Sequence, residues 1–277
     1  MDSFKQNVIV TGIPRGGTTL TAALIDSLTN SICLNEPKWQ EKWLRETIKH
    51  DQLVERLIND FAMIRKKIIN GEPVLDHRKK DGSPPTNYYS NAHQNKSKKR
   101  KKDKSIKQQP TVFNIDSKDF LLGIKHCTLY TGLLPQLIKS NEFSMIAITR
   151  HPVQTLLSWH SVGRYRRNKP QAVAAHWPEL NKIIATKDDQ LIKNAKIYDL
   201  FCQMYLNNRH HIRIIKYEDI IKGPSIFEKL FQRKFEEKVK INTKKRSPHY
   251  DYSLVDNIKE SLYQHAPHTL ELYSLDD

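Results

Sequence analysis

The residues with the clearest chemical potential in this chain of 277 residues form a glycine-rich turn, Gly12-Ile-Pro-Arg-Gly-Gly-Thr-Thr19. The β-branched run at 8–10 before it predicts a buried strand, and the periodic apolar residues at 20–28 predict a helix. A strand, a glycine turn and a helix in this order aim backbone N–H groups and a helix N-terminus at a phosphate. The stretch therefore predicts an anion site, with a plain strand-to-helix turn as the alternative.

The turn differs from the phosphate loop of nucleotide hydrolases at one informative position. Gly12 and Gly17 occupy the places of the two glycines of that loop, and Thr19 occupies the place of its Ser or Thr. Thr18 stands where the lysine belongs, and the cation lies earlier, at Arg15. This argues against an ordinary ATPase or kinase and for a different anionic group.

A second candidate anion site follows the apolar run 144–149, which predicts a buried strand. Arg150 comes at the end of this run, Pro152 opens a predicted helix, and Ser158 lies on that helix. A permanently charged guanidinium suits a phosphate dianion, and a hydroxyl can add a further donor. The alternative is a helix N-terminus with an incidental arginine.

Three further polar residues end predicted strands. Glu36 follows the short run 31–34, while Lys125 and His126 end the run 120–126. Open α/β sheets bind ligands at the carboxyl ends of their strands, so these side chains are candidate site residues. For Glu36 the alternative is a solvated carboxylate that pairs with a basic neighbour.

Together the two phosphate-binding patterns resemble those of sulfotransferases that use 3′-phosphoadenosine-5′-phosphosulfate (PAPS) as sulfonate donor. The turn resembles their 5′-phosphosulfate loop, and the Arg-Pro-Ser pattern resembles their 3′-phosphate site. The resemblance spans about residues 7–250. The donor-binding residues that it implies are Pro14, Arg15, Gly16, Gly17, Thr18, Thr19, Arg150 and Ser158.

The resemblance also implies catalytic roles. Glu36 is the first candidate for the base that takes the acceptor proton, and His126 is the second. Lys125 would contact the bridging oxygen or the sulfonate, and Arg15 would add positive charge, so no metal is expected. His126 follows Lys125 directly, whereas the cytosolic small-molecule enzymes place their histidine two residues after the lysine.

Two departures favour the carbohydrate and bacterial-type branch of the family. Leu20 stands where the cytosolic small-molecule enzymes carry a tryptophan that stacks on adenine, and no glycine follows Gly223 to form their C-terminal basic loop. Lys244 and Arg246 would supply the charge of that loop instead. The expected reaction is in-line transfer of the sulfonate of PAPS to a hydroxyl of a carbohydrate or glycoconjugate, and acidic saccharides are among the acceptors considered. The expected product of the donor is adenosine 3′,5′-bisphosphate.

The expected fold is a three-layer, P-loop-like α/β fold, a central parallel sheet flanked by helices, in a single domain over residues 1–277. Residues 71–110 are expected to be a disordered basic loop, because the lysine block 96–104 cannot bury itself. This block could also bind an acidic substrate or nucleic acid, or resemble a nuclear-import patch.

Composition bears on the partners and the cellular compartment of the protein. The formal net charge of +16 implies acidic partners. The three cysteines are predicted to be buried free thiols, which suits a reducing compartment. No signal peptide or membrane-spanning run is recognised, so the expected location is the cytoplasm.

Two other functions remain as alternatives. A P-loop nucleotide kinase would share the glycine turn, and a basic nucleic-acid-binding module would share the charge. A kinase needs ATP and magnesium, and a nucleic-acid binder shows steep salt dependence. A sulfotransferase binds adenosine 3′,5′-bisphosphate without magnesium.

Overall fold

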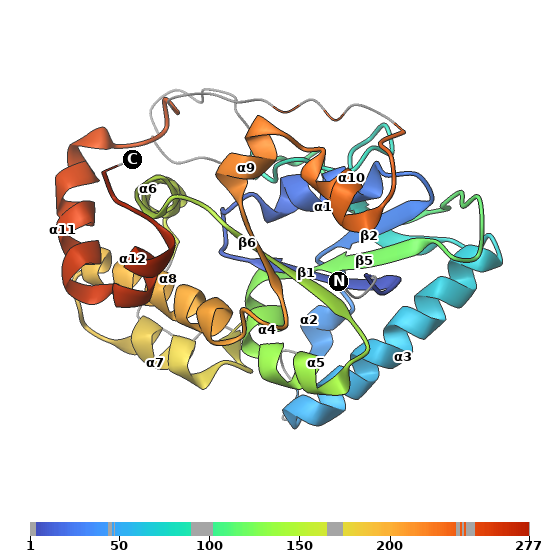
Figure 1. Ribbon diagram of the computed structural model, residues 1–277, viewed down its shortest axis with the longest axis horizontal. Helices are drawn as coiled ribbons and strands as arrows, with labels where there is room; N and C mark the ends of the chain where they lie inside the picture. The colour runs from blue at the N-terminus through green and yellow to red at the C-terminus, as the bar shows by residue number, and fades with distance from the viewer. Residues whose placement is uncertain are drawn as a thin grey trace.

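The computed structural model describes residues 4–43, 46, 48–89, 102–164, 174–236, 239, 241 and 247–276. Its central sheet has five strands in the order β2-β5-β1-β6-β7, and all neighbouring strands run parallel (Figure 1). The strands are β1 (Asn7–Gly12), β2 (Ser31–Asn35), β5 (Leu121–Lys125), β6 (Ser144–Thr149) and β7 (Arg213–Lys216).

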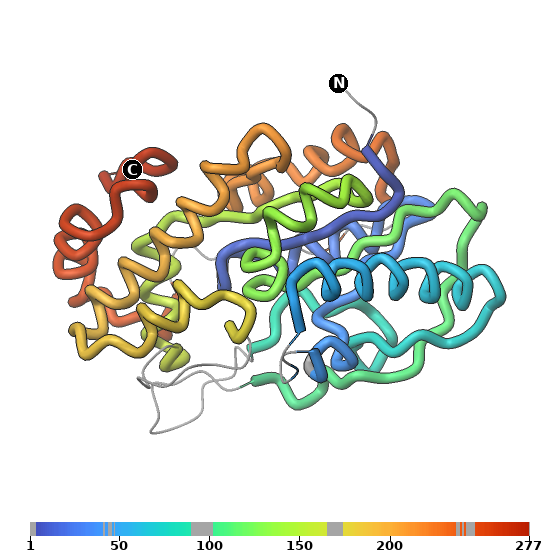
Figure 2. The backbone as a smooth tube through the Cα atoms, turned by 90° about the horizontal axis from the view of Figure 1, so that it is seen from below, coloured from blue at the N-terminus to red at the C-terminus, as the bar shows by residue number. Residues whose placement is uncertain are grey.

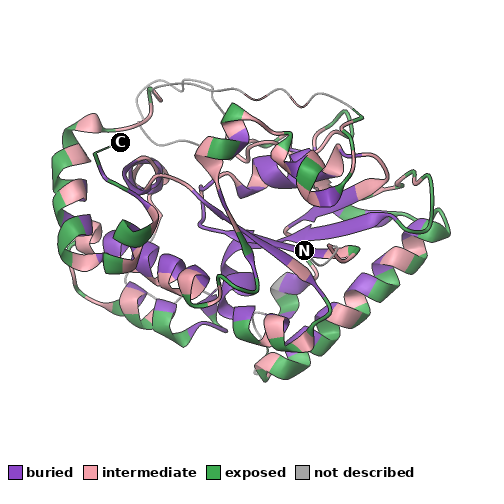
Figure 3. Ribbon diagram, in the orientation of Figure 1, coloured by how far each residue is buried: buried purple, intermediate pink, exposed green. Residues whose placement is uncertain are grey.

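Both faces of the sheet are covered, and for this reason its strands are rich in apolar residues throughout. Side chains alternate between the two faces: Val8 and Val10 belong to one hydrophobic cluster and Ile9 to the other. In Figure 3 the strands β1, β2, β5 and β6 are almost entirely buried, whereas the outer faces of the helices are exposed. The predicted three-layer α/β architecture is confirmed.

Helices lie on both sides of the sheet. The first group packs against the face of Val8 and Val10 and contains α1 (Thr18–Asp26), α9 (Tyr217–Lys222) and α10 (Ile226–Phe231). The second group lies on the face of Ile9 and contains α2 (Gln40–Trp43), α3 (His50–Ile69), α4 (Cys127–Gly132) and α5 (Leu134–Ser140).

The remaining helices gather at one end of the molecule, beside the edge of the sheet formed by β6 and β7 (Figure 2). There α11 and α12 pack on α8, and α6 packs on α8 and α11. These helices are α6 (Pro152–Val162), α7 (Pro178–Ala185), α8 (Gln190–Asn207), α11 (Val255–His265) and α12 (Pro267–Leu272), with a 3₁₀ turn at Tyr252–Leu254.

The expectation of a disordered loop over residues 71–110 is wrong at both ends. β3 (Val74–Arg78) and β4 (Lys107–Thr111) form an antiparallel pair there. Arg78 explains the order of these strands, because its guanidinium is buried against the carboxylates of Asp26 and Asp76. The segment between these strands, residues 79–106, is called the insertion below; residues 90–101, which hold most of the lysine block, lie outside the described residues.

The three cysteines are buried free thiols, as predicted. In the part of the chain that the structure describes, no helix combines the length and apolar character needed to span a bilayer.

Candidate active site

The carboxyl ends of all five parallel strands meet at one edge of the sheet. The register fixes this arrangement, because Lys125 lies opposite both Val10 and Asn35, and Gly12 lies opposite Ile148. The segments that leave this edge carry the candidate residues. They are the loop 13–17 after β1, Glu36 after β2, Lys125 at the end of β5, Arg150 after β6 and Tyr217 after β7.

The loop after β1 has the conformation of an anion cradle. Arg15 and Gly17 have φ angles of 70° and 99°, so the loop turns through the left-handed region. A Cβ at Gly17 would lie 2.3 Å from the ring of Tyr217, so glycine is required there. The N–H of Gly16 donates to Ile13 O at 2.8 Å and closes the turn.

The loop leads directly into α1, whose first N–H groups have no partner within the helix. These groups and the helix dipole favour an anion at this point. Of the two threonines that begin α1, Thr18 is buried with its hydroxyl 3.2 Å from the Cys127 thiol. Thr19 is half-buried, and its hydroxyl accepts a hydrogen bond from Lys125 Nζ at 3.5 Å.

The two predicted phosphate sites are in direct contact. Arg15 Nε donates to Ser158 Oγ at 3.2 Å, and Ser158 is fully buried on α6. Arg150 donates to the carbonyl of Arg15 at 3.5 Å, and its guanidinium lies 4.9 Å from the ring centre of Tyr217. Trp159 Nε1 donates to Pro14 O at 2.6 Å and holds the loop from the side of α6. Residues far apart in the sequence therefore form one cationic surface.

Glu36 and Lys125 form an ion pair with a distance of 2.7 Å between Oε1 and Nζ. Lys125 is buried, whereas the Glu36 side chain is 40% exposed. The backbone supports the pair, since Glu36 N donates to Lys125 O at 2.9 Å. Glu36 has a φ of 43°, which turns the chain sharply at the end of β2.

The charges of the pair stabilise each other. Burial raises the pKa of Glu36, but the cation of Lys125, assisted by His126, outweighs this effect and lowers the pKa to about 2. Burial lowers the pKa of Lys125, yet the net shift is upward, with Glu36 as one cause. Both side chains are therefore charged at neutral pH.

His126 caps α4. Its Nδ1 accepts a hydrogen bond from Leu129 N at 3.3 Å, so the neutral ring carries its proton on Nε2. Burial lowers the pKa of His126 to about 4, against the opposing charge of Glu36. The imidazole is thus neutral, and its basic nitrogen is already engaged.

The insertion supplies site residues that the sequence analysis missed. The ring centre of Tyr89 lies 4.5 Å from the Arg15 guanidinium, and Asn87 Oδ1 accepts from Arg15 at 3.3 Å. The ring centre of Tyr88 lies 5.6 Å from Lys125 Nζ. The available signal was an aromatic pair, Tyr88-Tyr89, inside an otherwise polar stretch.

Two more residues were missed. Tyr217 covers Gly17, and Arg164, just after α6, acts electrostatically on Glu36 and His126. Lys244 and Arg246 lie outside the described residues. Within the described ranges, no group of three or more His, Cys, Asp or Glu side chains could hold a metal ion.

Comparison with known proteins gives three findings. A family model described as a sulfotransferase domain matches residues 5–226. No curated protein matches the chain significantly. Among solved structures, the chain is similar to sulfotransferase STF1 from Mycobacterium tuberculosis H37Rv, with 11% identity, a TM-score of 0.39, and coverage of 95% of this chain and 77% of that chain.

Proposed function

This chain belongs to the sulfotransferase family, and we propose that it transfers the sulfonate of PAPS to a hydroxyl of a carbohydrate or glycoconjugate acceptor. The observation that carries the proposal is the contact between the loop and the Arg150 region, in which Arg15 Nε lies 3.2 Å from Ser158 Oγ. One surface thereby offers cations and hydrogen-bond donors for the two phosphate groups of PAPS.

The groups that line this surface fit PAPS by their chemistry. The loop Pro14–Thr19 and the N-terminus of α1 would hold the 5′-phosphosulfate, because N–H groups and a guanidinium favour an oxyanion. Arg150 and Ser158 would hold the 3′-phosphate. Lys244 and Arg246, which lie outside the described residues, would add positive charge for binding PAPS.

The proposed chemical step is an in-line displacement at sulfur. The acceptor oxygen forms a bond to sulfur while the bond from sulfur to the 5′-phosphate oxygen breaks, and the electron pair of that bond stays on the phosphate. The acceptor proton passes to the Glu36 carboxylate. Lys125 and Arg15 stabilise the charge that develops on the leaving phosphate, without a metal.

The ion pair couples these two roles. A carboxylate with a pKa of about 2 is a weak base while Lys125 is 2.7 Å away. As Lys125 turns towards the leaving oxygen, Glu36 loses that partner and its pKa rises towards the ordinary value. Glu36 then becomes a better base at the moment when the acceptor proton must leave.

His126 is the second candidate for the base, and its contacts favour Glu36 instead. Its Nδ1 already accepts from Leu129 N, and taking a second proton would place a cation in a buried position. Glu36 is partly exposed and can reach an acceptor that enters from solvent.

A nucleotide kinase explains the loop less well. In phosphate-loop kinases the hydroxyl at the position of Thr19 holds Mg²⁺. Here Lys125 Nζ lies 3.5 Å from that hydroxyl, so a cation from the protein already stands beside it. A nucleic-acid-binding module explains the net charge but not the convergence of Glu36, Lys125 and Arg150 on one sheet edge.

Calorimetry with two nucleotides tests the donor. Adenosine 3′,5′-bisphosphate should bind without magnesium and far more tightly than AMP, because only the former has the 3′-phosphate. Arg150→Ala should weaken the bisphosphate by about ten-fold or more, the worth of a hydrogen bond to a charged group. Equal affinities for the two nucleotides would refute the assignment of Arg150 and Ser158, and binding that requires ATP and magnesium would favour the kinase.

The acceptor class and the compartment belong to the same proposal. A net charge of +16 supports an acidic saccharide as acceptor. Buried free thiols at Cys33, Cys127 and Cys202 support a reducing compartment, the cytoplasm. A screen of neutral and acidic saccharides with labelled PAPS would identify the acceptor class.

A further inference from the structure

Tyr88 comes from the insertion and reaches the centre of the candidate site. Its carbonyl accepts a hydrogen bond from Asp103 N at 2.8 Å, so both legs of the insertion meet at this residue. Its ring faces Lys125 Nζ on one side and packs edge-to-face on His77, with 5.7 Å between the ring centres. These contacts hold the phenol beside the ion pair of Lys125 and Glu36.

The hydroxyl of Tyr88 is buried, and among the described residues it has no hydrogen-bond partner. A buried hydroxyl without a partner costs free energy, so such a group calls for an explanation. Burial, together with the negative charges of Glu36 and Asp76, raises the pKa of Tyr88 far above its ordinary value. The phenol therefore stays protonated and keeps a hydrogen to donate.

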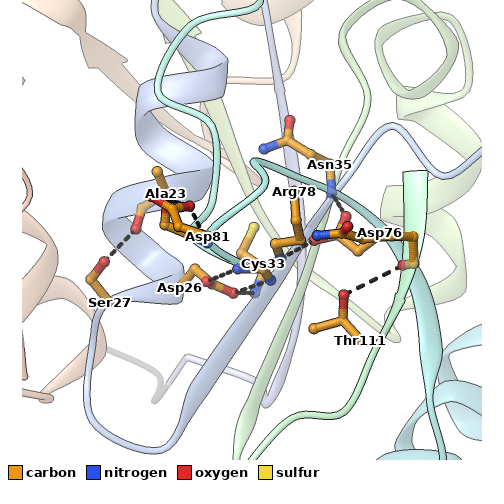
Figure 4. A network of polar contacts seen from close by, with 11 residues as sticks. Ala23, Asp26, Ser27, Cys33, Asn35, Asp76, Arg78, Asp81 and Thr111 are labelled. Atoms are coloured by element: carbon orange, nitrogen blue, oxygen red, sulfur yellow. Dashed lines mark hydrogen bonds and ion pairs between the residues drawn. The ribbon is translucent and has the colours of Figure 1, made fainter. Parts of the chain in front are cut away.

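Figure 4 shows the network of polar contacts at the base of the insertion. Arg78, at the end of β3, lies between two carboxylates, 2.6 Å from Asp26 and 2.8 Å from the buried Asp76. Asp76 in turn accepts from the backbone N–H of Asn35 at 2.8 Å, next to Glu36. This network fastens β3 to the end of β2, from which the insertion extends towards the site.

We infer that the Tyr88 hydroxyl donates a hydrogen bond to an oxygen of the sulfonate that is transferred. The inference rests on the proposed function, which places the sulfonate next to Lys125. Tyr88 is the described residue that combines a ring contact with Lys125 and a buried hydroxyl without a partner. A neutral donor there can bind the sulfonate without forming a competing ion pair with Glu36.

Two nucleotides that differ only in the sulfonate separate this role from a structural one. The affinities of PAPS and of adenosine 3′,5′-bisphosphate are measured by calorimetry for the unmodified chain, for Tyr88→Phe and for a control, Tyr263→Phe. Tyr263 is 52% exposed on α11, and its hydroxyl donates only an exposed hydrogen bond to Asp276, far from the candidate site in sequence. Tyr88→Phe should weaken PAPS about ten-fold and leave the bisphosphate unchanged, while the control should change neither.

Each other outcome has a distinct meaning. If Tyr88→Phe weakened both nucleotides equally, or neither, the inference would be wrong. If the unmodified chain bound neither nucleotide, the proposed function itself would fail. Thermal melting without ligand completes the test: Tyr88→Phe should be at least as stable as the unmodified chain, because the lost hydroxyl has no described partner, and a large loss of stability would show a structural role instead.

Discussion

At the level of single residues, Glu36 and Lys125 carry the proposed chemistry. Glu36→Gln should lower kcat by about 10²-fold or more, the usual worth of a general base, with donor affinity nearly unchanged. Lys125→Ala should lower kcat comparably, because the leaving phosphate loses its buried cation. Steady-state kinetics with labelled PAPS measures both effects.

Glu46→Gln is a matched control for the carboxylate. Glu46 pairs with Arg56 at 2.6 Å, but both side chains are more than 40% exposed, so its loss should leave kcat unchanged. A normal kcat in Glu36→Gln would shift the role of base to His126. Near-normal activity in Glu36→Gln, in His126→Asn and in the variant with both changes would show that neither residue is the base.

His126 should make the stability of the protein depend on pH. Its pKa of about 4 lies below the ordinary 6.5, so the unfolded chain binds the proton more readily. The stabilisation is fully present above pH 6.5 and is lost as the pH falls towards 4. His126→Asn keeps an acceptor for Leu129 N and removes the titration, so its free energy of unfolding should fall less over this range.

Urea unfolding at several pH values between 4 and 7 checks this expectation. The two proteins should diverge by up to about 3 kcal/mol, the equivalent of the pKa difference. His126→Ala should in addition lose about 1 kcal/mol at pH 7, because the cap of α4 is removed. Parallel pH profiles for the unmodified chain and His126→Asn would contradict the buried neutral imidazole.

At the level of elements, the β3–β4 pair depends on Arg78. Arg78→Met should destabilise the protein by about 3–5 kcal/mol, because it leaves the buried carboxylate of Asp76 and the largely covered carboxylate of Asp26 without their cation. Arg56→Met breaks an exposed ion pair of similar length and should cost less than about 1 kcal/mol. Chemical denaturation measures both; equal effects would mean that the buried network does not anchor the insertion.

The insertion itself should tolerate a deletion whose boundary the structure defines. Removing residues 96–101 should leave the Tm within a degree or two, because those residues lie between two legs that are joined at Tyr88 and Asp103. Removing 96–104 also deletes Asp103, and should weaken PAPS binding by releasing Tyr88. Thermal melting and calorimetry on both deletions test this difference, and a collapse of the fold in the shorter deletion would contradict it.

At the level of the whole molecule, the excess of positive charge should govern the encounter with the acceptor. With a formal charge of +16, the field attracts an acidic saccharide, and added salt screens that attraction. The KM of an acidic acceptor should therefore rise between about 0.05 and 0.3 M salt, because the screening length shortens over this range from roughly 14 to 6 Å. The KM of a neutral acceptor should stay nearly constant. An equal change of KM with salt for the acidic and the neutral acceptor would show that the net charge does not govern acceptor binding.

The local parts of the site could be predicted from the amino-acid sequence alone. The glycine turn, the arginine before Pro152 and the polar ends of the strands follow from short-range chemistry: backbone conformation, helix start signals and the alternation of apolar residues. The same short-range rules predicted a parallel sheet covered on both faces. They predicted the wrong structure at the ends of 71–110, because the lysine content outweighed the signal of two short strands whose order depends on a buried Arg78.

Which of these parts come into contact depends on how the whole chain folds. The strand order β2-β5-β1-β6-β7 places Glu36 against Lys125, 89 positions away, and Arg15 against Ser158, 143 positions away. It also brings Tyr88 and Tyr89 from the insertion to the phosphate loop. An apolar strand pattern is compatible with many strand orders, since each strand only needs two buried faces. The contacts of the site therefore depend on long-range packing, which no local pattern encodes.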